Sequence, residues 1–165
     1  MIQYDFCKEG GQLVILISAC LAGENVRYDG QNKKHTSLSH LVQCGLAQTI
    51  CPELLGGLSV PREPAEIVGG DGYDVLAGSA KVIDIKGNDV TKEYMQGAEL
   101  ALEICKNMHC DMLILKSDSP TCGSSTIYSG EFNGKKKWGV GLFTALLESN
   151  NIKVYDETNY MRNND

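Results

Sequence analysis

Three short apolar runs dominate the hydrophobic pattern of the chain. They cover residues 13–18, 46–50 and 112–115, and small and polar residues follow each of them. A continuous apolar run of this length is typical of a strand buried on both faces, as in a parallel sheet covered by helices. We therefore predict three core strands, with a minor strand at 126–128 and a last short strand at 152–154.

Apolar residues at helical spacing lie between these runs. The spacing predicts helices over 36–45, 92–108 and from 138 or 139 to 149. Residues 56–67 are rich in Gly and Pro and are expected to form a loop, whereas residues 73–85 are expected to hold a small strand pair. The alternation of strands and helices predicts an α/β fold: a mainly parallel, Rossmann-like sheet with helices on both faces, plus a small β-hairpin insertion.

Length and charge narrow the possible partners. The 165 residues are expected to form one domain over residues 1–165. The net charge is −6 and the only basic cluster is 135–137, so we expect no nucleic-acid polymer as partner. No apolar run approaches the roughly 20 residues that span a bilayer, and the chain lacks the basic start of a signal peptide. We expect a cytoplasmic protein with no membrane contact and a small-molecule ligand.

The chain has seven cysteines, an odd number, and no two of them form a C-x-x-C pair. An odd number in a protein expected inside the cell argues against a disulfide framework. The lack of such pairs excludes the local motifs of zinc ribbons, thioredoxins and ferredoxins. Any metal site must therefore be assembled from distant parts of the chain.

Three of the cysteines follow predicted core strands. Cys20, Cys51 and Cys122 lie beside small residues, which let the backbone approach a ligand closely. If the strands are parallel neighbours, the three thiols lie at the edge of the sheet where open α/β folds bind ligands. Helix N-termini and free amides there are expected to lower the pKa of the thiols. The other cysteines are expected to be small buried hydrophobes: Cys7, Cys44, Cys105 and Cys110.

Three thiolates without an obvious fourth ligand limit the possible metals. A structural zinc ion needs four ligands, so that His35 or His40 would have to join. A 4Fe–4S cluster held by three cysteines keeps one iron open to substrate, where it acts as a Lewis acid. A thiol redox enzyme would need two cysteines close enough to bridge, and the sequence points to no such pair.

Polar residues near these cysteines are candidates for catalysis and binding. Glu53 lies two residues after Cys51, and a carboxylate beside a metal site suits proton transfer. Ser119 lies three residues before Cys122, although a serine in a loop often bonds only to its own backbone. The candidates for binding an anionic substrate are Arg27, Arg62, Lys116 and Ser124.

At these residues the chain resembles a known family. The stretches that carry the resemblance are 18–23 with 27–30, 51–58 with 61–67, 89–91 with 97–98, and 119–123 with 127–128. The match as a whole covers about residues 13–155, and the motifs include the three cysteines at the strand ends. They resemble a small bacterial family long catalogued as a domain of unknown function, some of whose members are thiouracil desulfidases.

The resemblance implies a 4Fe–4S cluster, labile in air, held by Cys20, Cys51 and Cys122, with Glu53 and Ser119 as catalytic residues. It also implies a substrate, thiouracil or a thiouridine nucleotide. The hypothesis is therefore non-redox C–S cleavage: the open iron captures the sulfur, while the glutamate and the serine position and deprotonate a water molecule. The alternative is a non-catalytic zinc- or nucleotide-binding module that uses the same cysteines.

Overall fold

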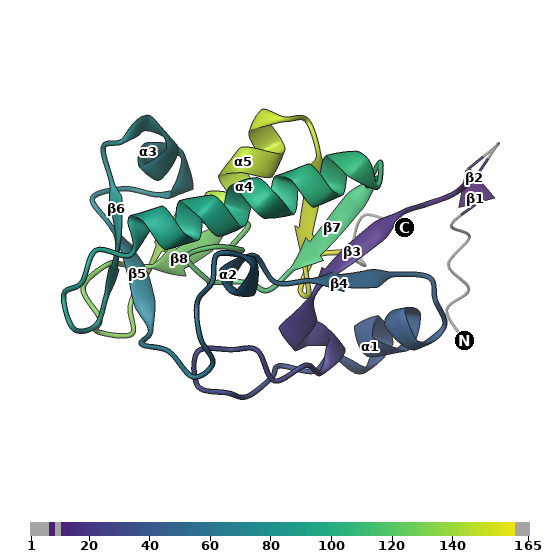
Figure 1. The fold of residues 1–165 in the computed structure, drawn as a ribbon, viewed down its shortest axis with the longest axis horizontal. Helices are drawn as coiled ribbons and strands as arrows, with labels where there is room; N and C mark the ends of the chain where they lie inside the picture. The colour runs from purple at the N-terminus through teal and green to yellow at the C-terminus, as the bar shows by residue number, and fades with distance from the viewer. Residues whose placement is uncertain (1–6, 9–10, 161–165) are drawn as a thin grey trace.

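The computed structural model of the chain describes residues 7–8 and 11–160, and its centre is a four-stranded sheet. The strands are β3 (Ile15–Ser18), β4 (Gln48–Ile50), β7 (Met112–Leu115) and β10 (Lys153–Asp156) (Figure 1). Their spatial order is β10-β7-β3-β4, and each neighbouring pair is parallel. The three strands predicted from the apolar runs are therefore confirmed, and they are direct neighbours in the sheet.

Side chains alternate along β3 and divide the interior into two cores. Leu16 packs in one core with Leu113, its partner on β7. Ile15 and Ile17 pack in the other core with Ile114, again from β7. Both faces of the sheet are thus apolar, which is why the sequence of these strands shows continuous rather than alternating hydrophobicity.

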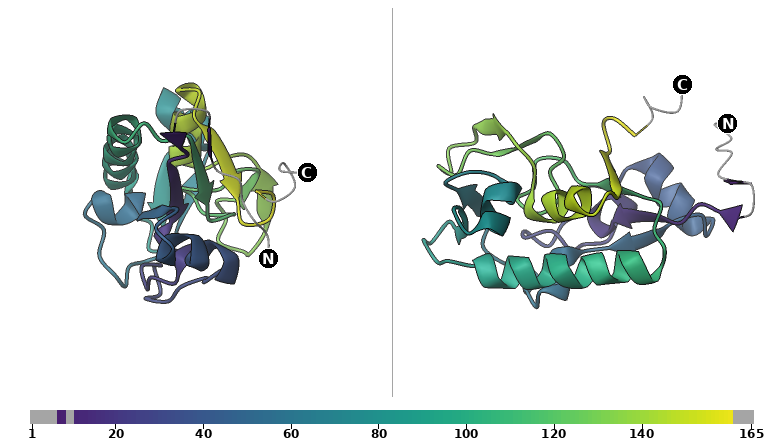
Figure 2. Two further views of the ribbon diagram at one scale, coloured as in Figure 1. Left: turned by 90° about the vertical axis from the view of Figure 1, so that its right-hand side faces the viewer. Right: turned by 90° about the horizontal axis from the view of Figure 1, so that it is seen from above.

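Helices cover both faces of the sheet, as predicted. The first core is closed by α4 (Thr91–Asn107) and α5 (Leu142–Ser149), and the second by α1 (Thr36–Gln43). Figure 2 shows α4 and α1 on opposite sides of the strands. None of the helices in the described part of the chain is long and apolar enough to cross a membrane.

The segment 65–84 departs from the prediction of a loop followed by a strand pair. It forms β5 (Ala65–Val68), α3 (Gly72–Ala77) and β6 (Lys81–Asp84), and β5 pairs antiparallel with β6. A capping box starts the unpredicted helix. The Asp71 carboxylate accepts the Tyr73 N–H at 3.0 Å, and the Asp74 carboxylate accepts the Asp71 N–H at 2.8 Å. The strand pair exists, but its first strand precedes this helix.

Two further antiparallel pairs flank the main sheet. The strands β8 (Thr126–Tyr128) and β9 (Lys136–Trp138) form one pair, and β1 (Cys7–Lys8) with β2 (Gly11–Gln12) forms the other. Because β9 takes residues up to 138, the last helix begins at Leu142, later than predicted. Figure 1 shows β8 next to β5, at the end of the molecule away from β1 and β2.

Candidate active site

The carboxyl ends of β3, β4 and β7 meet at one cavity. The short helix η1 (Ala19–Ala22) follows β3 and carries Cys20, while Cys51 follows β4 directly and Cys122 lies in a turn after β7. All three cysteines line a cavity of about 300 Å³. Neighbouring parallel strands end at the same edge of a sheet, so the topology itself brings these residues together.

Ser119 shapes the loop that carries Cys122. Its hydroxyl oxygen accepts the backbone N–H of Thr121 at 3.0 Å and that of Cys122 at 2.9 Å. Gly123 completes the turn, since a Cβ there would lie 2.7 Å from the carbonyl oxygen of Thr126. Ser119 also lines the cavity. Because two backbone amides occupy its lone pairs, its own O–H is left to donate.

Close packing of two helices holds Cys51 and Glu53 at the cavity. The helix α2 (Pro52–Leu55) begins directly after Cys51, with Pro52 in the first turn, where its missing N–H costs little. At Gly97 of α4, a Cβ would lie 2.0 Å from the carbonyl oxygen of Pro52, and the backbone of α4 leaves equally little room at Gly56. The two glycines therefore let α2 lie directly on α4.

Glu53 belongs to a largely buried charged network. Its Oε2 lies 3.0 Å from Nη2 of Arg62, whose side chain is only 6% exposed. The guanidinium also donates to the carbonyl oxygens of Val26 and Ser59, at 3.1 and 3.2 Å. Burial, followed by the charge of the nearby Glu53, raises the pKa of Tyr94, so that its hydroxyl stays protonated beside Glu53 and Arg62. Glu53 therefore reaches the cavity in a fixed orientation.

Burial raises the pKa of all three thiols, contrary to the expected lowering. The pKa of Cys20 rises to about 11, first through burial and then through Cys51. At Cys51 the amides at the start of α2 do lower the pKa, but burial outweighs them. Burial, followed by the charges of Glu53 and the other two cysteines, raises the pKa of Cys122. The free thiols are therefore neutral, and a cation that binds them must displace their protons.

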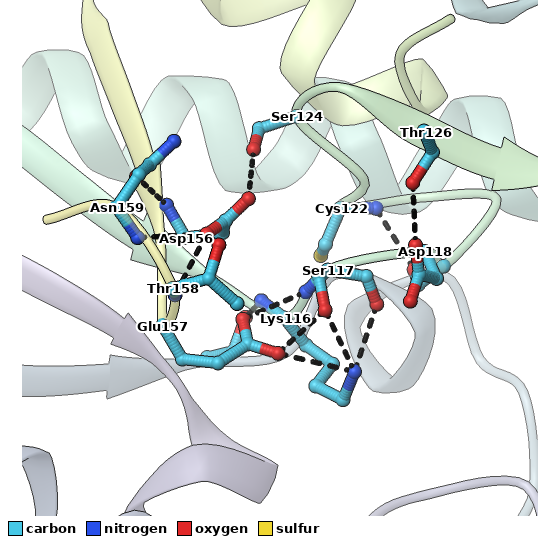
Figure 3. Close-up of polar contacts among 12 residues, drawn as sticks. Lys116, Ser117, Asp118, Cys122, Ser124, Thr126, Asp156, Glu157, Thr158 and Asn159 are labelled. Atoms are coloured by element: carbon cyan, nitrogen blue, oxygen red, sulfur yellow. Dashed lines mark hydrogen bonds and ion pairs between the residues drawn. The ribbon is translucent and has the colours of Figure 1, made fainter. Parts of the chain in front are cut away.

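Three of the four side chains predicted to bind an anionic substrate line the cavity, namely Arg27, Arg62 and Lys116. Each has a carboxylate partner in the chain. Arg27 lies 3.7 Å from Asp29, and Nζ of Lys116 lies 3.2 Å from Oε1 of Glu157 (Figure 3). Arg62 is paired with Glu53, as described above. An anionic substrate would therefore have to share or replace these partners.

Ser124 is the predicted residue that does not line the cavity. Its hydroxyl donates to Oδ2 of Asp156 at 2.6 Å (Figure 3). Asp156 is buried at the end of β10, and its Oδ1 accepts the N–H groups of Thr158 and Asn159 at 2.8 and 3.2 Å. Ser124 therefore ties the segment after Cys122 to the end of the neighbouring strand, which is a structural role.

The cysteines, and not the histidines, are the candidate ligands for a metal group at the cavity. Among the described residues, no group of three or more His, Cys, Asp or Glu side chains is placed to hold one metal ion. The two histidines considered as a fourth zinc ligand do not line the cavity: His35 packs edge-on against Tyr160, and His40 contacts Cys44. Three cysteine thiols at one cavity are ligands of the kind that hold iron–sulfur clusters.

The residues that line the cavity without an obvious mark in the sequence include Tyr94, Glu66 and Phe132. Tyr94 lies on the buried face of α4. Glu66 lies in β5 and is buried, and Phe132 lies between β8 and β9 with a positive φ of 53°. The sequence gives one indication of a special role for Glu66, because this carboxylate lies between two apolar residues, Ala65 and Ile67.

A parallel α/β fold with thiols, a carboxylate and a hydroxyl at the carboxyl edge of its sheet is the architecture of an α/β enzyme. Residues 15–159 match the family model of 2-thiouracil desulfurase. The chain therefore belongs to the 2-thiouracil desulfurase family, as the resemblance implied, and it is an enzyme of that family.

Individual relatives agree with this assignment. The solved structure of the 4Fe–4S-dependent thiouracil desulfidase TudS matches with a TM-score of 0.81 and 41% identity, over 92% of this chain and 95% of that chain. The uncharacterized protein YbbK of Bacillus subtilis (strain 168) is 47% identical over 144 residues, which are 87% of this chain and 95% of YbbK. The match to TudS confirms the predicted fold class.

Proposed function

We propose that the protein is a desulfidase that removes sulfur from a thiolated pyrimidine, either thiouracil or a thiouridine nucleotide, by non-redox C–S cleavage. The observation that carries the proposal is the convergence of Cys20, Cys51 and Cys122 on one cavity with Glu53 and Ser119. The likeness to TudS, described as 4Fe–4S-dependent and as acting on thiouracil, supports the same cofactor and substrate class here.

The thiolates of Cys20, Cys51 and Cys122 would hold a 4Fe–4S cluster. When bound, such a cluster supplies an open iron that acts as a Lewis acid with affinity for sulfur. The net reaction exchanges the thiocarbonyl sulfur for the oxygen of a water molecule and releases hydrogen sulfide. Both protons of the water leave with the sulfur, and no electrons are gained or lost.

Glu53 and Ser119 would move and hold the protons of this exchange. Glu53 accepts a proton from the attacking water, and its contacts with Arg62 and Tyr94 fix the carboxylate in one orientation for that transfer. Ser119 donates its O–H to the negative charge that develops on the substrate, because its oxygen already accepts two loop amides.

Arg27 and Lys116 are the side chains that we propose for binding a phosphate group on a nucleotide substrate. Both line the cavity, and both pair with acidic residues that a phosphate could replace. Arg62 is held by Glu53 and two backbone carbonyls, and Ser124 by Asp156. We therefore assign Arg62 to the orientation of the catalytic glutamate and Ser124 to the architecture of the loop.

Anaerobic reconstitution with iron and sulfide tests the proposal. The loaded protein should be brown, absorb broadly near about 400 nm and hold about four iron atoms per chain. It should consume the thiouracil absorbance band and release an equal amount of sulfide. Cys122→Ala should lose both iron and turnover, while Cys44→Ala, which changes an exposed cysteine, should keep both.

Equal turnover by wild type and Cys122→Ala would refute the desulfidase assignment. A colourless wild-type protein that holds about one zinc ion per chain after anaerobic purification would instead support a zinc-binding module. Both measurements use the same preparation, so the two functions are compared directly.

A further inference from the structure

Aromatic and apolar side chains also line the cavity that the cysteines line, and we call this group the aromatic wall. Phe132, in the loop between β8 and β9, lines this wall together with Tyr128 from the end of β8. Tyr28 and Ile85 add to it from other parts of the chain. One cavity therefore contains thiols, charged groups and an apolar surface against which the face of a flat ring can pack.

The backbone of Phe132 is unusual for such a bulky residue. Its φ of 53° lies in the left-handed region, which side chains other than Gly, Asn and Asp rarely adopt. Gly130 and Gly134, on either side, also have positive φ angles, of 94° and 76°. An unfavourable conformation at a cavity-lining residue is typical of a side chain that is held in place for function.

A buried carboxylate holds Phe132 in this conformation. Oε1 of Glu66 accepts the backbone N–H of Gly130 at 2.9 Å and that of Phe132 at 3.2 Å. The loop lies directly on β5, because a Cβ at Gly130 would be 2.6 Å from the carbonyl oxygen of Ile67. Burying a carboxylate is costly unless it is hydrogen-bonded, and here its bonds go to the backbone of this loop.

We propose that Phe132 contacts the face of the substrate's pyrimidine ring and selects planar substrates, and that Glu66 is the positioning residue that holds Phe132 there. The inference rests on the proposed function and extends it to the choice of substrate. A thiolated pyrimidine matches both parts of the cavity, since its sulfur suits the thiol side and its ring suits the aromatic wall. Stacking of a base on an aromatic side chain adds affinity without distinguishing between bases.

Three variants of the cluster-loaded protein test the role of Phe132. Phe132→Ala should raise KM for thiouracil roughly tenfold, the loss expected from one stacked ring, with kcat unchanged within about twofold. Phe132→Leu keeps the apolar character without the ring and should lie between Ala and wild type. Phe132→Tyr keeps the ring and should match wild type.

Calorimetry measures the same contact without turnover. Uracil, the flat product, should bind Phe132→Ala roughly tenfold more weakly than wild type. Dihydrouracil, whose ring is puckered, should bind wild type and Phe132→Ala equally. The preference for the planar ring should therefore disappear when Phe132 is removed.

Glu66 is tested through the loop that it holds. Glu66→Leu should raise KM as Phe132→Ala does. The KM of the double variant should be no higher than that of either single variant, because both changes remove the same contact between Phe132 and the substrate. Glu66→Gln keeps the accepting oxygen and should restore a KM close to that of wild type. Trypsin should cut after Lys135, in the same loop, faster in Glu66→Leu than in Glu66→Gln.

The outcomes separate this inference from the function on which it rests. If loaded wild type releases no sulfide from thiouracil, the proposed function is wrong and the role of Phe132 in substrate choice falls with it. If wild type turns over but Phe132→Ala keeps the wild-type KM and the wild-type affinity for uracil, only the present inference is wrong. If Glu66→Leu misfolds, the Phe132 variants still test whether Phe132 contacts the substrate ring.

Discussion

Cysteines gather at both ends of the parallel sheet, but the two groups are built in different ways. At the carboxyl end, Cys20, Cys51 and Cys122 come from three separate loops and line one cavity. At the amino end, Cys105 and Cys110 are close in sequence, and the Cys110 N–H donates to the Cys105 carbonyl oxygen at 2.9 Å where α4 ends.

The electrostatic surroundings of the two groups also differ. Cys105 lowers the pKa of Cys110, and Cys110 in turn raises the pKa of Cys105. The Cys110 thiol itself donates to the carbonyl oxygens of Val14 and Met112. These two thiols therefore satisfy each other and the local backbone. At the carboxyl end, burial raises the pKa of all three thiols, and Cys51 adds to the rise at Cys20 and at Cys122.

The comparison shows which feature of a cysteine indicates chemistry. Burial does not distinguish the two groups, because Cys105 is 1% exposed and Cys122 is 7% exposed. The difference is that the carboxyl-end thiols come from distant segments and share their cavity with Glu53 and Lys116. Cys105 and Cys110 lie close together because α4 ends between them, so that their proximity does not indicate a bound ligand.

The largest expected effect comes from alanine substitution at the two ends. Cys51→Ala should lose the iron and the desulfidase activity of the reconstituted protein, since one of three ligands is missing. The double variant Cys105→Ala, Cys110→Ala should keep iron content and kcat, and should lower the free energy of unfolding by about 1–3 kcal/mol. Iron analysis, thiouracil turnover and urea unfolding measure the three quantities. Loss of iron in the double variant would contradict the division of the cysteines drawn here.

A smaller effect is expected from the tyrosine behind the catalytic glutamate. Tyr94→Phe removes the hydroxyl that interacts with Glu53 and should lower kcat roughly tenfold, the factor that corresponds to about 1.4 kcal/mol, with iron content unchanged. Tyr73→Phe is the matched control, because the exposed Tyr73 bonds to Glu148 at 2.5 Å and does not line the cavity. Equal kcat in the two variants would mean that Tyr94 does not help to position Glu53.

The sheet could be predicted from the sequence because its strands are buried on both faces. Continuous apolar runs such as 13–18 and 112–115 are typical of strands that helices cover on both sides, and the structure confirms both strands. The segment 65–84 could not be predicted in the same way. Its helix is six residues long and depends on the capping box of Asp71 and Asp74, within a stretch whose glycines indicate a turn.

The candidate site could be predicted only where it depends on local sequence. The position of a cysteine after a core strand follows from local sequence, so that Cys20, Cys51 and Cys122 could be chosen by inspection. The roles of Glu66 and Phe132 depend on hydrogen bonds between segments more than sixty positions apart. The pKa of the thiols was predicted in the wrong direction, because sequence shows a helix N-terminus but not the degree of burial that outweighs it.

The smallest expected effect concerns the reactivity of the amino-end pair. Cys105 lowers the pKa of Cys110, so that between this lowered pKa and the usual value near 9 wild type holds more Cys110 thiolate than a variant that lacks the Cys105 side chain. Cys105→Ala should therefore slow the alkylation of Cys110 by iodoacetamide at pH 8, because the thiolate is the reacting form. Cys105→Ser restores a donor and should recover the rate. The exposed Cys44 gives an internal reference in the same mass spectrum.

The lowered pKa of Cys110 also makes the free energy of unfolding depend on pH. A folded-state pKa below the unfolded value stabilises the fold above the unfolded pKa, and this contribution is lost as pH falls through the folded pKa. The difference in unfolding free energy between Cys105→Ser and Cys105→Ala should therefore grow as pH rises from 7 toward 9. A difference that is constant over this range would show that Cys105 acts on Cys110 through packing alone, and the contrast between the two ends of the sheet would then be one of position and not of electrostatics.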